Sequence, residues 1–247
     1  MCTSLVLVWR NPVDRTWVPV GKLKYQNNEY VFNYTKGARQ AHKVSNFVPF
    51  GNMIEFGQTY NSKELFPIFK NRVLQKSRPE YKDYLTWLDI TEETATPLLE
   101  LARSGGIRAT DSLQLFQIPE NNNGFYEANF FTHGLRHLAP SYLERVNSLS
   151  PNDKLLLTKD IQNEYDPFAL LIRTDDPPEL VGYSPVYYAK DFSKLIKQNP
   201  ISSTTVTVQK VNLTAPVQFR LLCNFKTSWP EGFKPFDDES FEIINNI

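Results

Sequence analysis

The chain has 247 residues, of which 41% are hydrophobic and 22% are charged, as in a folded globular protein rather than a disordered one. Its 27 Lys and Arg residues balance 27 Asp and Glu residues, which excludes a strongly basic, general polyanion binder but permits a local nucleic-acid site. Two cysteines, Cys2 and Cys223, are too few for a disulfide framework or a zinc site. We expect reduced thiols and, without a secretory signal or a membrane-spanning segment, a cytoplasmic protein with no membrane partner.

The first half of the chain begins with predicted strands. SLVLVW, residues 4–9, is typical of a buried strand. VGKLKY and EYVFNYT predict a hairpin whose turn is Gln26-Asn27-Asn28, because these amide side chains suit a tight turn. The sequence therefore predicts a small β-sheet at the start of the chain.

Three predicted helices follow these strands. Ser62 suits the N-cap of the first, whose apolar stripe is Leu65, Phe66, Phe69 and Val73. Pro79 suits the first position of the second helix. The third helix is predicted to start near Thr91 or Glu92 and to end at Gly105-Gly106. DSLQLFQI, residues 111–118, is then predicted as a strand.

The segment PENNNGFYE, residues 119–127, predicts a linker between two modules. We therefore expect one module over residues 1–118 and a second over 128–247. In the second, ANFFTHGLRHL, DKLLLTKD, FALLIRT, LVGYSP, TTVTVQKVN and PVQFRLLCNF predict strands, VYYAKDFSKLIKQN predicts a helix, and residues 145–149 predict a turn. The expected fold class is α+β, with a small sheet plus helices followed by an OB-like barrel with one or two helices.

Motifs for enzyme chemistry are missing from the sequence. It contains no phosphate-binding glycine loop, no dinucleotide-binding glycine motif and no Gly-x-Ser-x-Gly elbow. His133 and His137 have a spacing that metals use, but no third ligand stands near them. We expect no catalysis, no cofactor and no metal, with an unrecognised hydrolase as an alternative.

Tyrosines and cations lie close to the turns of the second half: Tyr165, Tyr183, Tyr187, Tyr188, Arg136, His137, Lys159, Arg173 and Lys190. Single-stranded nucleic acid is bound by such sets, because bases stack on aromatic rings while cations contact phosphates. Alternatively, the tyrosines pack against the barrel and leave only their hydroxyls in water.

Three motifs of the second half resemble the HIRAN family in order and spacing. They are Gly134-Leu135-Arg136 in the first strand region, the Asn-x-Tyr-Asp-x-x-Ala segment at 163–169, and Val181-Gly182-Tyr183 ahead of a helix. The resemblance covers about residues 128 to 230. It implies an OB-like barrel, and in the eukaryotic helicase-like members this module binds the 3′ end of single-stranded DNA.

Carried onto this sequence, the resemblance implies a DNA-binding site formed by Arg136, His137, Tyr165, Asp166 and Tyr183. An Asp carboxylate can accept a hydrogen bond from a terminal 3′-hydroxyl, which an internal phosphodiester lacks. The sequence continues with His137 where those DNA-binding members have the first of two tyrosines. Asp166 either closes its own loop or holds a DNA end.

The first half is similar to the N-terminal subdomain of HipA-type serine/threonine kinase toxins. The similarity rests on VGKLKYQNNEYVFNYTKGARQA, FVPF and YNSKELFPIFKNRVL, and it covers about residues 4 to 90. In some bacterial systems this subdomain is a separate protein that neutralises such a kinase. The resemblance implies a kinase partner, and Trp87, which lies off the apolar stripe of its helix, is the residue that we expect to contact it. Alternatively, Trp87 packs under the strands.

Two functions follow from these resemblances. The first is a bacterial, non-catalytic antitoxin or inhibitory partner of a HipA-like kinase, with a HIRAN module that contacts the kinase or DNA. The second is an accessory protein of DNA repair or phage defence that binds the 3′ end of single-stranded DNA.

Overall fold

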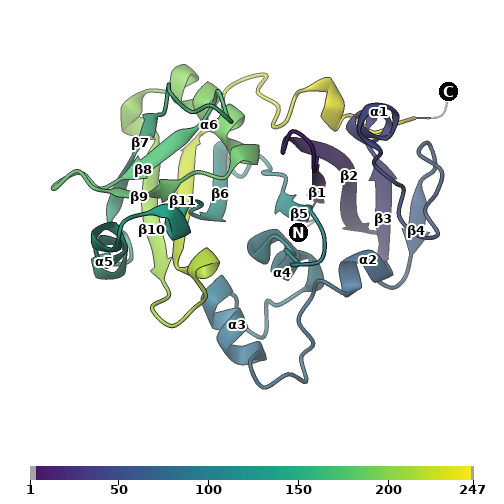
Figure 1. Cartoon of the computed structure of the whole chain (residues 1–247), viewed down its shortest axis with the longest axis horizontal. Coiled ribbons are helices and arrows are strands. Elements are labelled where there is room, and N and C mark those ends of the chain that lie inside the picture. The colour runs from purple at the N-terminus through teal and green to yellow at the C-terminus, as the bar shows by residue number, and fades with distance from the viewer. Residues whose placement is uncertain (1–3, 246–247) are drawn as a thin grey trace. The chain divides into compact units, whose positions relative to one another are not determined.

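The computed structural model describes residues 4–245, so Cys2 lies outside the described residues (Figure 1). The chain forms two compact units. The first comprises Met1–Thr86, Ile90–Ile118 and Phe236–Ile247, and the second comprises Trp87–Asp89 and Pro119–Pro235. Each contains an antiparallel sheet, and the described residues include six α-helices, which confirms the predicted α+β class.

The first unit is built on a five-stranded antiparallel sheet in the order β4-β3-β2-β1-β5. Its strands are β1 (Ser4–Arg10), β2 (Trp17–Gln26), β3 (Glu29–Tyr34), β4 (Tyr60–Ser62) and β5 (Leu113–Gln117). The predicted hairpin is confirmed as β2–β3, because Gln26 pairs with Glu29 around Asn27 and Asn28. Both turn residues have positive φ, 54° and 62°, as a type I′ hairpin turn requires.

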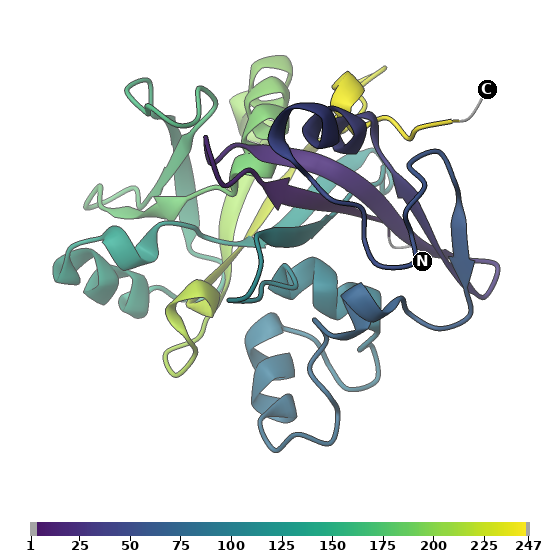
Figure 2. The same ribbon diagram turned by 45° about the vertical axis from the view of Figure 1, so that its right-hand side comes forward.

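Four helices belong wholly or largely to the first unit: α1 (Lys36–Ser45), α2 (Pro67–Lys70), α3 (Tyr81–Leu88), whose last two residues lie in the second unit, and α4 (Pro97–Ser104). In Figures 1 and 2, α1 lies above the strands of the sheet and α2 and α4 lie below them. Together with the sheet they enclose a core that contains the Phe32 ring. The centroid of this ring lies 4.9, 6.4 and 5.5 Å from the ring centroids of Tyr34, Phe66 and Phe69.

Two helix predictions need correction, and one helix was missed. The helix expected from Ser62 is only the single turn α2, which begins at Pro67. Ser62 itself is the last residue of β4 and pairs with Tyr30 of β3. The third helix starts after Thr96, whose hydroxyl accepts the N–H of Leu99 at 3.3 Å, rather than near Thr91. The helix α1 was not predicted, because it buries only small residues and carries no large apolar stripe.

The C-terminal segment returns to the first unit, whereas the expected second module runs to residue 247. It contains the 3₁₀ turn η4 (Glu239–Phe241), and Ile243 forms a β-bridge with Thr35. The next residue, Ile244, is buried in the core of this unit. Gly37 permits this packing, because a Cβ there would lie 2.3 Å from Pro19 O and 3.0 Å from Ser240 O.

The second unit contains a six-stranded antiparallel sheet in the order β6-β11-β10-β7-β8-β9, curled into an OB-like half-barrel. Its strands are β6 (Phe125–Phe131), β7 (Lys154–Lys159), β8 (Leu170–Arg173), β9 (Leu180–Tyr183), β10 (Thr205–Val211) and β11 (Leu221–Ser228). Just beyond the end of β6, His133 forms a β-bridge with Tyr183 of β9. This bridge joins the two edges of the sheet and maintains its curl.

The helices of this unit are α5 (Pro140–Ser148) and α6 (Val186–Gln198), with the 3₁₀ turns η1 (Leu135–His137), η2 (Ile201–Ser203) and η3 (Val217–Phe219). The helix α6 confirms the prediction, but most of the turn predicted at residues 145–149 lies within α5. The segment Gly134-Leu135-Arg136 was predicted as a strand, and it turns into η1 because Gly134 adopts φ 80°. Strand β6 begins at Phe125, inside the range expected to be a linker. Within residues 4–245, no helix has the length and apolar character needed to cross a bilayer.

Candidate nucleic-acid interface

The loop between β7 and β8, residues 160–169, is ordered by hydrogen bonds from its own side chains. Asn163 Oδ1 accepts the N–H groups of Tyr165 at 3.1 Å and of Asp166 at 2.9 Å. Asp166 Oδ1 in turn accepts the N–H of Phe168 at 2.8 Å. Such Asn and Asp turns fix a backbone that no strand partner holds.

This loop exposes large apolar side chains. Tyr165 is 86% exposed, Ile161 84% and Phe168 39%. The segment FALLIRT, residues 168–174, was predicted as a strand. Leu170 and Ile172 are buried, whereas Phe168 is not, because it precedes the strand and lies on the loop. The loop therefore presents aromatic surface to solvent on an ordered backbone.

Asp166 closes its own loop through one carboxylate oxygen. Burial of the half-buried side chain raises the pKa of this carboxyl, and the hydrogen bond from the Phe168 N–H opposes that rise. The other oxygen, Oδ2, accepts no hydrogen bond from any described residue. One acceptor position of Asp166 is thus structural, and the other is available to a ligand.

Asp160 connects this loop to β9, a role that the sequence analysis missed. Its Oδ2 accepts the hydroxyl of Tyr183 at 3.1 Å and the side-chain amide of Asn163 at 3.2 Å. The sequence signal was its position directly after β7 and three residues before Asn163. The pKa of Tyr183 is raised mainly by burial and to a smaller extent by the hydrogen bond to Asp160, so its hydroxyl remains a donor.

Two glycines bring the 132–134 segment against β9. A Cβ on Gly182, which has φ 125°, would lie 2.9 Å from Thr132 Cβ and 3.0 Å from His133 O. A Cβ on Gly134 would lie 3.3 Å from the Tyr183 ring. The backbones of His133 and Tyr183 exchange two hydrogen bonds of 2.9 Å across this contact. The Val-Gly-Tyr motif therefore needs glycine for backbone approach.

The basic residues of the site lie on η1. The Arg136 and His137 side chains are exposed, and Arg136 forms no ion pair within the described range of the chain. Burial, with a smaller contribution from Arg136, lowers the pKa of His133 to about 4, so its ring is neutral at neutral pH. That ring meets the edge of Tyr187 at 6.0 Å between centroids.

A continuous series of contacts joins the predicted DNA-binding residues. Arg136 lies in the turn that starts at Gly134, Gly134 lies under Tyr183, and Tyr183 bonds Asp160. From Asp160 the contacts pass through Asn163 to the backbones of Tyr165 and Asp166. His133 and His137 belong to no metal-binding group among residues 4–245.

Trp87, the residue expected to contact a kinase, is partly buried. Its carbonyl oxygen accepts the side-chain amide of Asn212 at 2.8 Å, and the adjacent Asp89 accepts that of Gln209 at 3.0 Å. Residues 87–89 accordingly cluster with the second unit. These hydrogen bonds involve the Trp87 backbone and the Asp89 side chain, so the contact of the Trp87 ring with a kinase stays a prediction.

The second unit is thus an OB-like half-barrel with an ordered aromatic loop, as in small domains that bind ligands at a barrel edge. Residues 125–228 match the family model "HIRAN domain", and this part of the chain is a HIRAN domain. The family match stops short of the first unit's sheet, and the resemblance to the HipA subdomain gains no support.

Among solved structures, the HIRAN domain of human HLTF is similar at 16% sequence identity and a TM-score of 0.32. The match covers 44% of this chain and 78% of that chain. At this TM-score the likeness carries no structural argument. No curated protein matches the chain.

Proposed function

We propose that the HIRAN domain of this chain binds the 3′ end of single-stranded DNA. The proposal is supported by the family match and by one geometric observation: the connected contacts from Arg136 through Tyr183 and Asp160 to Asp166. In this proposal, the DNA end contacts the cation, the ring and the carboxylate of this set.

Each residue of this set has a distinct role in the proposal. The second oxygen of Asp166 accepts the terminal 3′-hydroxyl, while the exposed Tyr165 ring stacks on the last base. Arg136 and His137 lie on the exposed turn and contact the adjacent phosphate. Tyr183 positions the loop through Asp160. These roles require no catalysis and no cofactor.

No observation favours the kinase-inhibitor hypothesis in the same way. Its sequence basis lies in the first unit, which the family match does not reach, and Trp87 is partly buried. The DNA-end function is therefore the one that we put forward.

The test compares two labelled oligonucleotides that differ only at the 3′ end, one with a hydroxyl and one with a phosphate. We expect the protein to prefer the hydroxyl strand by about 10-fold or more, because a hydrogen bond to a charged group contributes about 1.5–3 kcal/mol. Asp166→Asn should abolish the preference, because it replaces the second carboxylate oxygen with an NH₂ group that cannot accept the 3′-hydroxyl. Asn keeps one oxygen as acceptor for the Phe168 N–H, so the loop should be preserved. The measurement is fluorescence anisotropy.

Glu164→Gln is the matched control, because Glu164 is an exposed carboxylate in the same loop. It removes one charge and should leave the preference unchanged. Equal binding of the two oligonucleotides by the unaltered protein would show that no terminal-hydroxyl site exists.

A further inference from the structure

The helix α1 of the first unit carries cations that the described chain does not neutralise. Residues 36–45 include Lys36, Arg39 and Lys43 and no Asp or Glu. Lys36 is neutralised by Glu239 and Glu242, each at 2.8 Å. Arg39 and Lys43 are exposed and form no ion pair with any residue of the 4–245 range. They lie one helical turn apart, where like charges repel.

A second pair of cations lies at the adjacent loop between β1 and β2. The side-chain amide of Asn11 donates to Ser45 Oγ at 3.2 Å, which ties this loop to the C-terminal end of α1. Arg10 Nε donates to Arg15 O at 3.3 Å, and burial and the charge of Arg15 lower the pKa of Arg10. Asp14 is the acid of this loop, and its carboxylate accepts the N–H and hydroxyl of Thr16.

Exposed valines border these cations. Val44 in the last turn of α1 is 73% exposed, Val48 in the following loop 71%, and Val13 in the β1–β2 loop 86%. The Phe47 N–H donates to Ala41 O at 3.3 Å, so the segment that carries Val48 folds back on the helix. Exposed apolar residues that gather beside unneutralised cations indicate an interaction surface. We call Arg39, Lys43, Val44, Val48 and the loop 10–15 the α1 surface.

We propose that the α1 surface binds internal nucleotides of single-stranded nucleic acid. Arg39 and Lys43 contact successive phosphates, and the valines contact base faces that a single strand exposes and a duplex hides. The choice of nucleic acid over other anionic and apolar partners rests on the function proposed above for the HIRAN domain. The surface is separate from the terminal-hydroxyl site, since its residues belong to the first unit.

The test uses the full chain and a labelled 20-nucleotide strand that ends in a 3′-phosphate, so that the terminal-hydroxyl site contributes little. Arg39→Ala with Lys43→Ala should weaken binding about 3- to 10-fold. It should also reduce the slope of log K against log salt by about 1.4, the value for two phosphate contacts on a single strand. Val44→Ser with Val48→Ser should weaken binding without changing that slope.

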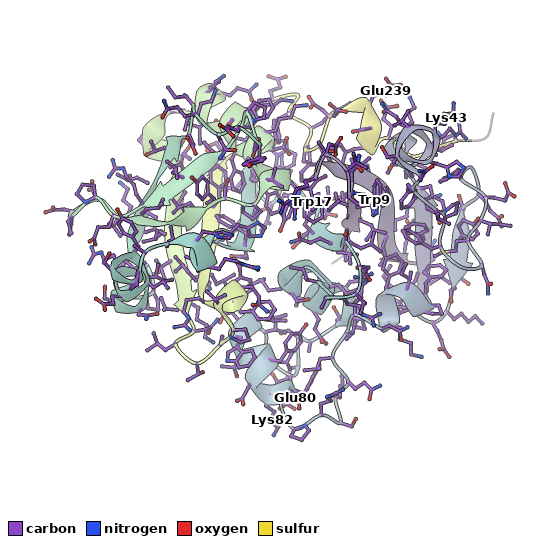
Figure 3. All side chains as sticks on the ribbon, in the orientation of Figure 1. Trp9, Trp17, Lys43, Glu80, Lys82 and Glu239 are labelled. Atoms are coloured by element: carbon purple, nitrogen blue, oxygen red, sulfur yellow. The ribbon has the colours of Figure 1, made fainter. Side chains whose placement is uncertain are left out.

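Lys70→Ala with Lys82→Ala is the matched control, because it also removes two positive charges. These lysines are paired with Glu64 at 3.2 Å and Glu92 at 3.6 Å. Figure 3 shows Lys82 on α3, at the opposite side of the first unit's helices from Lys43 on α1. The control should bind like the unaltered protein.

Three further measurements separate the outcomes. Asp166→Asn should change the preference for a 3′-hydroxyl but not the salt slope, so either proposal can fail without the other. The α1 proposal is overturned if the Arg39/Lys43 variant binds the blocked strand normally, or if a duplex of the same sequence binds more tightly than the strand. It is also overturned if that variant loses binding only to phosphatidylserine vesicles, which would identify a membrane surface instead.

Discussion

Tyr34 in the first unit and Tyr183 in the second both end a strand, yet their hydroxyls have different partners. The Tyr34 hydroxyl donates to Met53 O at 2.8 Å and accepts the Phe50 N–H at 2.7 Å, inside a closed core. The Tyr183 hydroxyl donates to the Asp160 carboxylate at 3.1 Å, at the edge of an exposed loop. Backbone partners make the first tyrosine structural, whereas a carboxylate partner couples the second to a surface that a ligand can reach.

The surrounding aromatic residues differ in the same way. In the first unit, the Tyr34 ring packs against the rings of Phe32, Phe50 and Phe56. In the second, the Tyr165 N–H donates to Asn163 Oδ1 at 3.1 Å in the loop beside Tyr183, and the Tyr165 ring is exposed. The second unit also has an aromatic core, in which the rings of Phe192 and Phe225 stack with their centroids 4.0 Å apart. The difference therefore lies in the 160–169 loop, where polar turns hold an aromatic side chain in solvent.

The largest effect is expected at Gly182, where the half-barrel closes. Gly182→Ala should destabilise the protein by about 3 kcal/mol or more, because a Cβ would meet Thr132 and His133 and φ 125° disfavours alanine. Gly232→Ala is the control, since Gly232 has φ 72° and no atom within 4 Å of its added Cβ, and should cost about 1 kcal/mol. Chemical denaturation measures both, and equal losses would mean that the close approach does not hold the sheet.

Acid should weaken the same closure through His133. The folded pKa of about 4 lies below the usual 6.5, so between these values only the unfolded chain binds the proton. The free energy of unfolding therefore keeps its full value above pH 6.5 and falls by up to about 3 kcal/mol as the pH drops toward 4. His133→Phe removes this titration. The free energy of unfolding of the two proteins, measured at several pH values, should diverge in that window, and parallel curves would contradict the low pKa.

The two tyrosines give the smallest and most direct comparison. Tyr34→Phe should cost about 1–3 kcal/mol, because it leaves the part-buried Phe50 N–H without its acceptor. Tyr183→Phe should cost about 1 kcal/mol or less, since Asp160 can turn to water, yet it should weaken binding of the 3′-hydroxyl oligonucleotide. Thermal unfolding and anisotropy on both variants test this. A larger stability loss in Tyr183→Phe would reverse the comparison.

Local signals in the sequence predicted much of the fold. Asn27-Asn28 determined a hairpin turn, Gly105 ended α4 with φ 74°, and the segment VYYAKDFSKLIKQN predicted α6, in which Tyr188, Phe192 and Leu195 are buried. These features depend on residues that are close in the chain. Helix α1 escaped prediction because its buried residues, Gly37, Ala38 and Ala41, are small and form no large apolar stripe.

The candidate site divides in the same manner. The order of the motifs at 134–136, 163–169 and 181–183 is a property of the sequence alone, and it was sufficient to indicate the HIRAN family. Only the tertiary structure assigned Asp160 to Tyr183, exposed Phe168, and left one oxygen of Asp166 open. The Asp160–Tyr183 contact joins residues that are 23 positions apart across β7, β8 and β9, and local spacing does not encode it. The exposure of Phe168 and the open oxygen of Asp166 depend on the turn that the 163–168 segment adopts between these strands.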